Sequence, residues 1–319
     1  MVTYVSKKDE DALLINNPLD VLAESEKYET EIFFTMARKL YDDCAIQSKD
    51  LYRMTLKITD NFRNITPEMI VADSRIIKVL RYCMIPAISQ MKLGQLVGLD
   101  TTSGIEDEKI TKGRKLSKLK TISPKLCEIF NNYLDRQRFL WLQTELSPRE
   151  YQLAIEYSEN WTCSLISNQN SSTMFRNWRK ELQETSAEKQ IIEAGYCSVG
   201  TRPTISSIED LLPGKFSREC RIVGRSIQKA DLVVRLKKSK KLLIIEAKAI
   251  GVRIDSYKRI KECREKFDDW TQTFGDNAEV GVVLSGFIQE SEVTSLIKEG
   301  VHLFWEYSGK DLYDYLSHE

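Results

Sequence analysis

The feature that most constrains this fold is a pair of apolar runs separated by five residues, ADLVVRL at 230–236 and LLIIEAK at 242–248. Branched aliphatic residues dominate both runs, which is typical of buried strands, whereas the KKSKK between them is polar and suits a turn. We therefore expect an antiparallel hairpin within a sheet. If the chain folds back about Ser239, residue 231 lies opposite about residue 247.

Three side chains suited to catalysis meet at the open end of this hairpin. Asp231 lies across from Glu246 and Lys248, which share one face of their strand because side chains alternate. Two carboxylates this close repel each other unless a cation bridges them. Mg²⁺ suits such a site, since it binds through one or two carboxylates and keeps water and phosphate in its other positions. The metal would polarise a phosphoryl oxygen while Lys248 positions or activates the attacking water, so the trio indicates phosphodiester hydrolysis.

Composition excludes several other chemistries. The chain has only two histidines, His302 and His318, which leaves little room for a histidine-based triad or a zinc site. Neither GxxxxGK[ST] nor GxGxxG after a strand is present, so a nucleotide-binding phosphate loop is not expected. The 319 residues carry 47 basic and 47 acidic side chains. This balance predicts no global attraction to nucleic acid, but it leaves room for a local basic surface.

The cysteines and the hydropathy pattern predict a cellular compartment. Seven cysteines, an odd number without a CxxC pair, fit a reducing environment better than a disulfide framework. No run approaches 18 apolar residues, and residues 1–10 lack the apolar stretch of a signal peptide. We therefore expect a cytoplasmic protein without a membrane segment.

Glycine is distributed unevenly, and this suggests two domains. The first glycine is Gly94, and ten of the fourteen lie between Gly195 and Gly309. Long amphipathic patterns fill the first part of the chain, whereas short β-branched runs alternate with helical patterns after about residue 205. We expect a mostly helical region at 1–180 for DNA recognition or dimerisation, and an α/β (α+β) core with a mixed central sheet at 181–319.

Two segments of the helical region are candidates for DNA contact. The pattern of Ile88–Ile105 is similar to that of a helix-turn-helix motif. Gly104, however, stands where the second helix needs an apolar residue, so a single helix that ends at Gly98 is the better interpretation. The segment 101–124 reads as a surface loop. Its basic residues form either a solvated face or an arm that contacts phosphates, and the three we single out are Lys112, Arg114 and Lys115.

The hairpin and the segments after it resemble known nucleases. An Asp 15 positions before Glu246, an apolar LLII run into ExK and a following helix resemble the PD-(D/E)xK nuclease core, with Ala230 in place of its proline. Further motifs follow in the order found in XamI-like type II restriction endonucleases, over about residues 185–316. They are DSYKR at 255–259, Trp270, FG at 274–275, VGVVLSG at 280–286 and GVHLFWE at 300–306.

This resemblance implies a Mg²⁺-dependent enzyme that cuts double-stranded DNA at a specific site in a bacterial or archaeal cytoplasm. Asp231 and Glu246 would be metal ligands, and Lys248 would position or activate water. Cutting both strands of a short palindrome needs two active sites related by a two-fold axis, so we expect a homodimer. The family further implies a DNA methyltransferase that protects host DNA.

Further residues are candidates for the metal site or for DNA contacts. The superfamily often holds an extra acidic residue near the metal, and Glu193 is the candidate here; a solvated helix residue is the alternative. Ser256 is carried over from the family pattern and otherwise simply caps a helix. Four basic residues are candidates for DNA phosphate contacts, two in the first turn of that helix and two in the hairpin turn: Lys258, Arg259, Lys237 and Lys238.

Two other functions remain open at this point. A PD-(D/E)xK nuclease of repair or recombination would share the trio, although such enzymes seldom need so long a helical region. A DNA-binding protein that has lost cleavage is the second alternative, and the intact Asp231, Glu246 and Lys248 argue against it.

Overall fold

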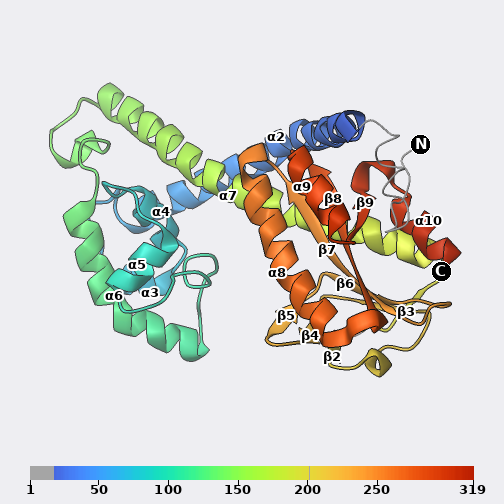
Figure 1. Ribbon diagram of the computed structural model, residues 1–319. Coiled ribbons are helices and arrows are strands. Elements are labelled where there is room, and N and C mark those ends of the chain that lie inside the picture. The colour runs from blue at the N-terminus through green and yellow to red at the C-terminus, as the bar shows by residue number, and fades with distance from the viewer. Residues whose placement is uncertain (1–17, 201) are drawn as a thin grey trace. The chain divides into compact units, whose positions relative to one another are not determined.

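The computed structural model describes residues 18–200 and 202–319, and these form two compact units. Residues 37–174 make up the first, which we call the helical unit. Residues 18–36 and the described residues from 175 to 319 make up the second, which we call the sheet unit. Two long helices, α2 (Pro18–Ile58) and α7 (Pro148–Glu193), contribute residues to both units (Figure 1).

The helical unit has its own apolar core, built where α2, α7 and several shorter helices meet. The largest fully buried side chains include Tyr52 of α2 and Phe130 of α6. Thr66 begins α3 by accepting a hydrogen bond from the backbone N–H of Met69, which satisfies one of the free donors of the first turn. The shorter elements are α3 (Pro67–Ala72), α4 (Ile76–Tyr82), α5 (Gln90–Leu96), α6 (Gly113–Tyr133) and the 3₁₀ turn η1 (Leu140–Leu142).

The structure corrects one expectation for this unit and agrees with another. The segment 101–124 is not all loop, because α6 begins at Gly113 and runs through Pro124. Lys112, Arg114 and Lys115 therefore lie at an exposed helix start, where Lys115 pairs with Glu108. The segment 88–105 contains a single helix, α5, which ends before Gly98, and no second helix follows within it.

The sheet unit contains a six-stranded mixed sheet of order β1-β3-β6-β7-β8-β9 and a small sheet of order β2-β4-β5. The main-sheet strands are β1 (Cys197–Ser198), β3 (Lys215–Arg218), β6 (Leu232–Arg235), β7 (Leu242–Ile250), β8 (Ala278–Gly286) and β9 (His302–Trp305). The small sheet consists of β2 (Thr204–Ile205), β4 (Arg221–Val223) and β5 (Ile227–Lys229). The helices after β7 are α8 (Ser256–Phe274), α9 (Glu290–Lys298) and α10 (Asp311–His318). Short 3₁₀ turns complete the unit: η2 (Ile208–Asp210), η3 (Arg253–Asp255), η4 (Gly275–Asn277) and η5 (Glu306–Ser308).

Helices cover both faces of the main sheet, and strand alternation decides which side chains meet which helices. Val233 and Ile244 are buried with Trp270 of α8, in a cluster that also includes α9. Their neighbour Ile245 is buried in a separate cluster with Leu316 of α10 and residues of α7. Figure 1 shows α8 lying across the sheet. The expected α/β class with a helical N-terminal region and a mixed central sheet is thus confirmed.

The hairpin forms as expected, with a register one residue away from that obtained by folding about Ser239. Leu232 pairs with Ile245, so the next position places Asp231 directly opposite Glu246. The shift arises in the turn, where the backbone N–H of Leu236 bonds to the carbonyl of residue 241 and leaves four residues between them. The strand β4, which precedes the hairpin in the sequence, lies outside the main sheet and belongs to the small one.

The boundary expected near residue 180 lies inside the uninterrupted α7. The two units divide within that helix, between residues 174 and 175, and also within α2, between residues 36 and 37. The first half of α2 belongs to the sheet unit, although it precedes the helical unit in sequence. Ser25 accepts a hydrogen bond from the backbone N–H of Gly286 at 2.9 Å, and Glu29 pairs with Arg179 at 2.7 Å. Gly286 itself has φ +98°, and a Cβ there would collide with the carbonyl of Ile250.

A polar cluster lies at one end of the strands of the main sheet, around Glu279 near the start of β8. Its carboxylate contacts His302 of β9 at 3.2 Å, Lys241 at 3.0 Å and the hydroxyl of Tyr315. These hydrogen bonds, that of His302 foremost, lower the pKa of Glu279 to about 2 although its burial acts in the opposite direction. The carboxylate is therefore ionised at neutral pH and stabilises the folded state.

Candidate active site

The two carboxylates of the expected trio lie at neighbouring positions of adjacent strands. Asp231 immediately precedes β6, and Glu246 lies within β7 on the directly opposite position. Side chains opposite each other in an antiparallel pair have Cβ atoms about 5 Å apart. The backbone N–H of Ala247 donates to Oδ2 of Asp231 at 2.9 Å, which fixes one carboxylate, and the side chain of Glu246 is 1% exposed.

Lys248 completes the trio and contacts Glu246 directly. Its Nζ donates to Oε2 of Glu246 at 2.8 Å, and both side chains project from the same face of β7. Burial by itself lowers the pKa of Lys248, but the nearby acidic groups, Glu246 foremost and Asp231 with it, outweigh this effect, and the net result is a raised pKa. Lys248 is therefore an ammonium group at neutral pH in this arrangement.

Two further lysines, which the sequence did not single out, approach the same carboxylates. Lys266 of α8 donates to Oε1 of Glu246 at 2.8 Å, so a lysine binds each oxygen of that carboxylate. Lys180 of α7 lies 3.7 Å from Oδ1 of Asp231. Burial acts to lower the pKa of Lys180, yet Asp231 and Glu184 raise it overall.

These residues line a pocket of about 470 Å³ in the sheet unit. Seven of its side chains are basic and three are acidic. The basic ones are Arg176, Arg179, Lys180, Lys229, Lys248, Arg259 and Lys266. Because the whole chain has no net charge, this positive excess is a local property and suits a polyanionic ligand.

The donor set of the pocket fits Mg²⁺. Asp231 and Glu246 supply hard carboxylate oxygens from opposite positions, and the lysines on both sides of Glu246 show how strongly this carboxylate draws cations. Across residues 18–200 and 202–319, no group of three or more His, Cys, Asp and Glu side chains forms a closed metal site. An open Mg²⁺ site needs only one or two carboxylates, since water and phosphate complete its coordination. Asp231 and Glu246 would be the residues that hold the ion.

Comparison with known proteins now decides the family. The model of the XamI restriction endonuclease family matches residues 60–305, which is well over half of the chain and includes Asp231, Glu246 and Lys248. The chain belongs to the XamI restriction endonuclease family. It is therefore a DNA-cleaving hydrolase, and the resemblance inferred from its motifs is confirmed.

Two individual proteins give further comparisons. The type II restriction enzyme SalI of Streptomyces albus G is 27% identical over 310 residues, which cover 92% of this chain and 95% of SalI. A crystal structure of protein VC1899 from Vibrio cholerae aligns with a TM-score of 0.30 at 16% identity. That alignment covers 55% of this chain and 45% of VC1899, and so loose a likeness supports no conclusion.

Two of the expected site residues, Glu193 and Ser256, do not line the pocket that contains Asp231 and Glu246. Glu193 is at the end of α7 that adjoins the hairpin turn, is half exposed and pairs with Lys189 at 3.7 Å. The α7 residue beside Asp231 is Lys180, and the 13 residues from there to Glu193 span roughly 20 Å of helix. Ser256 is fully buried, and its hydroxyl accepts the backbone N–H of Gln289. It supports a loop and has no exposed atom for DNA.

The expected basic contacts divide into two groups. Arg259 lines the pocket and Lys258 beside it is exposed, so both stay candidates for phosphate contacts. Lys237 and Lys238 lie at the turn, about 13 Å from Glu246 along β7. Lys237 donates to the carbonyl of residue 194 at 3.0 Å, and Lys238 donates to that of residue 318 at 2.6 Å. Their contacts therefore secure the ends of α7 and α10.

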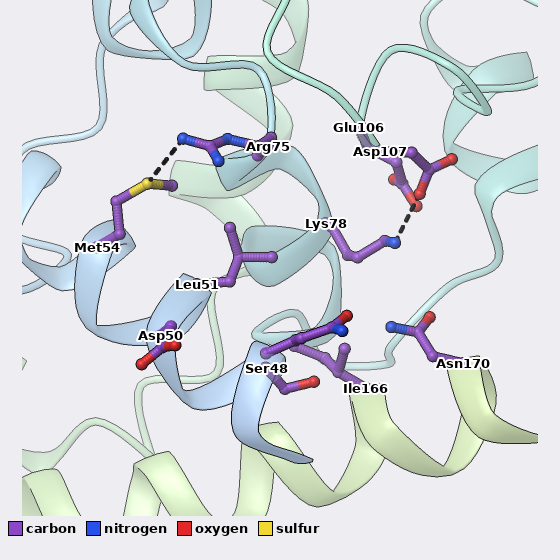
Figure 2. A pocket seen from close by; sticks show the side chains of 11 residues that line it. Ser48, Asp50, Leu51, Met54, Arg75, Lys78, Glu106, Asp107, Ile166 and Asn170 are labelled. Atoms are coloured by element: carbon purple, nitrogen blue, oxygen red, sulfur yellow. Dashed lines mark hydrogen bonds and ion pairs between the residues drawn. The ribbon is translucent and has the colours of Figure 1, made fainter. Parts of the chain in front are cut away.

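A second pocket, of about 370 Å³, lies within the helical unit. Figure 2 shows that its cations already have partners: Lys78 contacts Asp107 at 2.6 Å, and Arg75 contacts the Met54 sulfur at 3.3 Å. Arg75 also pairs with Asp73 at 2.6 Å. The residues drawn there include no two carboxylates on opposite strands of a hairpin with a lysine beside them, so this pocket lacks the arrangement found in the sheet unit.

In the part of the chain that the structure describes, no helix combines the length and the apolar character needed to cross a lipid bilayer.

Proposed function

We propose that this chain is a type II restriction endonuclease that uses Mg²⁺ to hydrolyse phosphodiester bonds of double-stranded DNA at a short palindromic site. The observation that carries the proposal is the placement of Asp231 opposite Glu246, with the Nζ of Lys248 2.8 Å from Glu246. The positive pocket around them suits a DNA backbone. The relative SalI, similar over nearly its whole length, is named a type II restriction enzyme.

Each residue of the trio has a distinct role in the proposed reaction. Asp231 and Glu246 hold the metal, and the backbone N–H of Ala247 keeps Asp231 in position. When bound, Mg²⁺ would supply polarisation of a phosphoryl oxygen and a more acidic water. Lys248 positions or activates the attacking water beside the scissile phosphate. Arg259 and Lys258, at the start of α8, contact neighbouring phosphates.

The symmetry of the proposed target determines the assembly. A palindromic site presents the same phosphate environment on both strands, so two copies of the chain related by a two-fold axis would cut both. The helical unit would contribute DNA recognition or dimerisation, with Lys112, Arg114 and Lys115 on phosphates. We further propose that the enzyme works in a bacterial or archaeal cytoplasm beside a DNA methyltransferase that protects the host sequence.

Incubation of plasmid and phage DNA with the purified protein and Mg²⁺ tests this proposal. Discrete fragments that end at one shared sequence support a restriction enzyme. A smear or cleavage confined to branched DNA indicates a repair or recombination nuclease instead. Binding without cleavage in Mg²⁺ and Mn²⁺ indicates a DNA-binding protein that has lost its activity.

A further inference from the structure

Lys266 makes a set of contacts that an ordinary surface lysine on a helix does not make. Its Nζ donates to Oε1 of Glu246 at 2.8 Å and to the backbone carbonyl of Lys229 at 2.7 Å. The same ammonium lies 5.7 Å from the centre of the Trp270 ring, one helical turn further along α8. Its side chain is only 28% exposed. These three contacts come from different elements and hold the charge in one place.

The position of this charge matters because both carboxylate oxygens of Glu246 already bind a lysine, which leaves little room for a metal ion to approach. Lys248 occupies Oε2 and Lys266 occupies Oε1, both at 2.8 Å, and the carboxylate is buried. A divalent ion that binds to Glu246 must either displace one ammonium or approach it within a few ångströms. Like charges at such distances in a partly buried site repel strongly. The metal therefore meets a competing cation that is part of the protein.

Lys266 and Lys248 differ in how they can respond to the metal. Lys248 lies two residues from Glu246 on the same strand and is the lysine of the ExK motif. Lys266 is anchored from another element, and its bond to the Lys229 carbonyl does not depend on Glu246. It therefore stays near the site as a fixed positive charge when the carboxylate turns to a metal.

We propose that Lys266 is a positioning residue that holds the Glu246 carboxylate in the metal-free enzyme and competes with the divalent ion for its Oε1. This competition weakens metal binding in free enzyme. When DNA binds, the negative charge of its phosphate offsets the charge of Lys266 and restores the affinity for the metal. Metal binding and DNA binding thereby become coupled. The inference rests on the proposed function, since it takes Glu246 as a metal ligand.

Lys266→Gln isolates the charge, because the amide keeps a hydrogen-bond donor for the Lys229 carbonyl and Glu246. Mn²⁺ is titrated into the full-length protein without DNA, and the free ion is followed by electron paramagnetic resonance. We expect binding on the order of tenfold tighter or more than in the wild type, because one repelling charge is gone. Lys266→Arg keeps the charge and is expected to retain wild-type affinity.

Lys229→Gln is the matched control, because Lys229 lines the same pocket but pairs with Glu219 in place of Glu246. We expect little change in Mn²⁺ affinity there. In Lys266→Gln, the Mg²⁺ concentration for half-maximal DNA cleavage should change much less than the Mn²⁺ affinity of the free protein, because bound DNA already offsets the charge of Lys266. Unchanged or weaker Mn²⁺ binding in Lys266→Gln overturns the inference and leaves Lys266 as a structural ion pair. If the wild type cuts no DNA at all, the proposed function fails, while the Mn²⁺ comparison still decides the role of Lys266.

Discussion

Replacement of Lys248 by alanine separates catalysis from structural support at this site. Loss of one partner from a buried ion pair costs roughly 3–5 kcal/mol when the other charge is left uncompensated. Here Glu246 keeps a second cation, because Lys266 binds its other oxygen at 2.8 Å. We therefore expect Lys248→Ala to destabilise the fold by only about 1–2 kcal/mol. For a chain of this size that corresponds to a melting temperature about 5 °C lower or less.

Cleavage should respond very differently from stability. Lys248 is expected to act once water and the scissile phosphate are in place, so its removal takes away stabilisation of the transition state and leaves DNA binding intact. We expect cleavage to fall by roughly 10³-fold or more, measured as single-turnover nicking of supercoiled plasmid with Mg²⁺. Binding of the same DNA, measured in Ca²⁺ by fluorescence anisotropy, should change by less than about threefold.

A double variant supplies the control for this reasoning. Lys248→Ala with Lys266→Met leaves the buried Glu246 without either of its cations, so its melting temperature should drop well beyond the sum of the single changes. The catalytic assignment is refuted if Lys248→Ala alone melts far below the wild type while the remaining folded protein still cleaves DNA.

Two further predictions concern other parts of the chain. Changing Lys112, Arg114 and Lys115 together to glutamine should weaken binding of cognate and random DNA alike. The slope of the logarithm of the binding constant against the logarithm of the salt concentration should become less steep by up to about 3, as measured by anisotropy titrations at several salt concentrations. An unchanged slope would mark these residues as solvated and not in contact with phosphates. The control carries the same change at three exposed lysines that each have a carboxylate four residues on: Lys189, Lys261 and Lys310. Because the pKa of Glu279 is lowered to about 2, its charge stabilises the fold above pH 4.3 or so, and this contribution of about 3 kcal/mol disappears as the pH falls towards 2. Glu279→Gln should therefore lower the melting temperature at pH 7 and make it less dependent on pH between 4.5 and 2; an unchanged acid dependence would contradict the role given to that cluster.

The hairpin was predictable because its signals are local. Strand propensity, the polar turn and side-chain alternation together placed Asp231 beside Glu246 and Lys248. The register was one residue off because a turn can close around four residues or five. The four-residue turn places Lys240 in the left-handed region, with φ +58°. Lysine has no special preference for that region, so the sequence of the turn does not indicate its length.

The remaining site residues were not predictable because they depend on packing between distant segments. Lys266 approaches Glu246 only because the apolar face of α8 docks on the sheet and fixes the rotation of the helix. In the sequence, only its position four residues before the apolar Trp270 indicates that Lys266 lies on the side of α8 that faces the sheet. Glu193 was misplaced for the same reason, since the pattern of α7 does not reveal which of its turns lies beside Asp231. Likewise, nothing in residues 18–36 indicates that they pack on the sheet unit.

The central claim is that Asp231 and Glu246 form the metal-binding centre of a DNA-cleaving enzyme. Its most direct test is a comparison of the wild type with Asp231→Asn and Glu246→Gln on phage DNA, with Mg²⁺ and without it. We expect discrete fragments only from the wild type with Mg²⁺, and several orders of magnitude less cleavage from either variant. Both variants should still bind DNA, at equal or higher affinity because a carboxylate no longer repels phosphate. Near-normal, Mg²⁺-dependent cleavage by either variant would contradict the account.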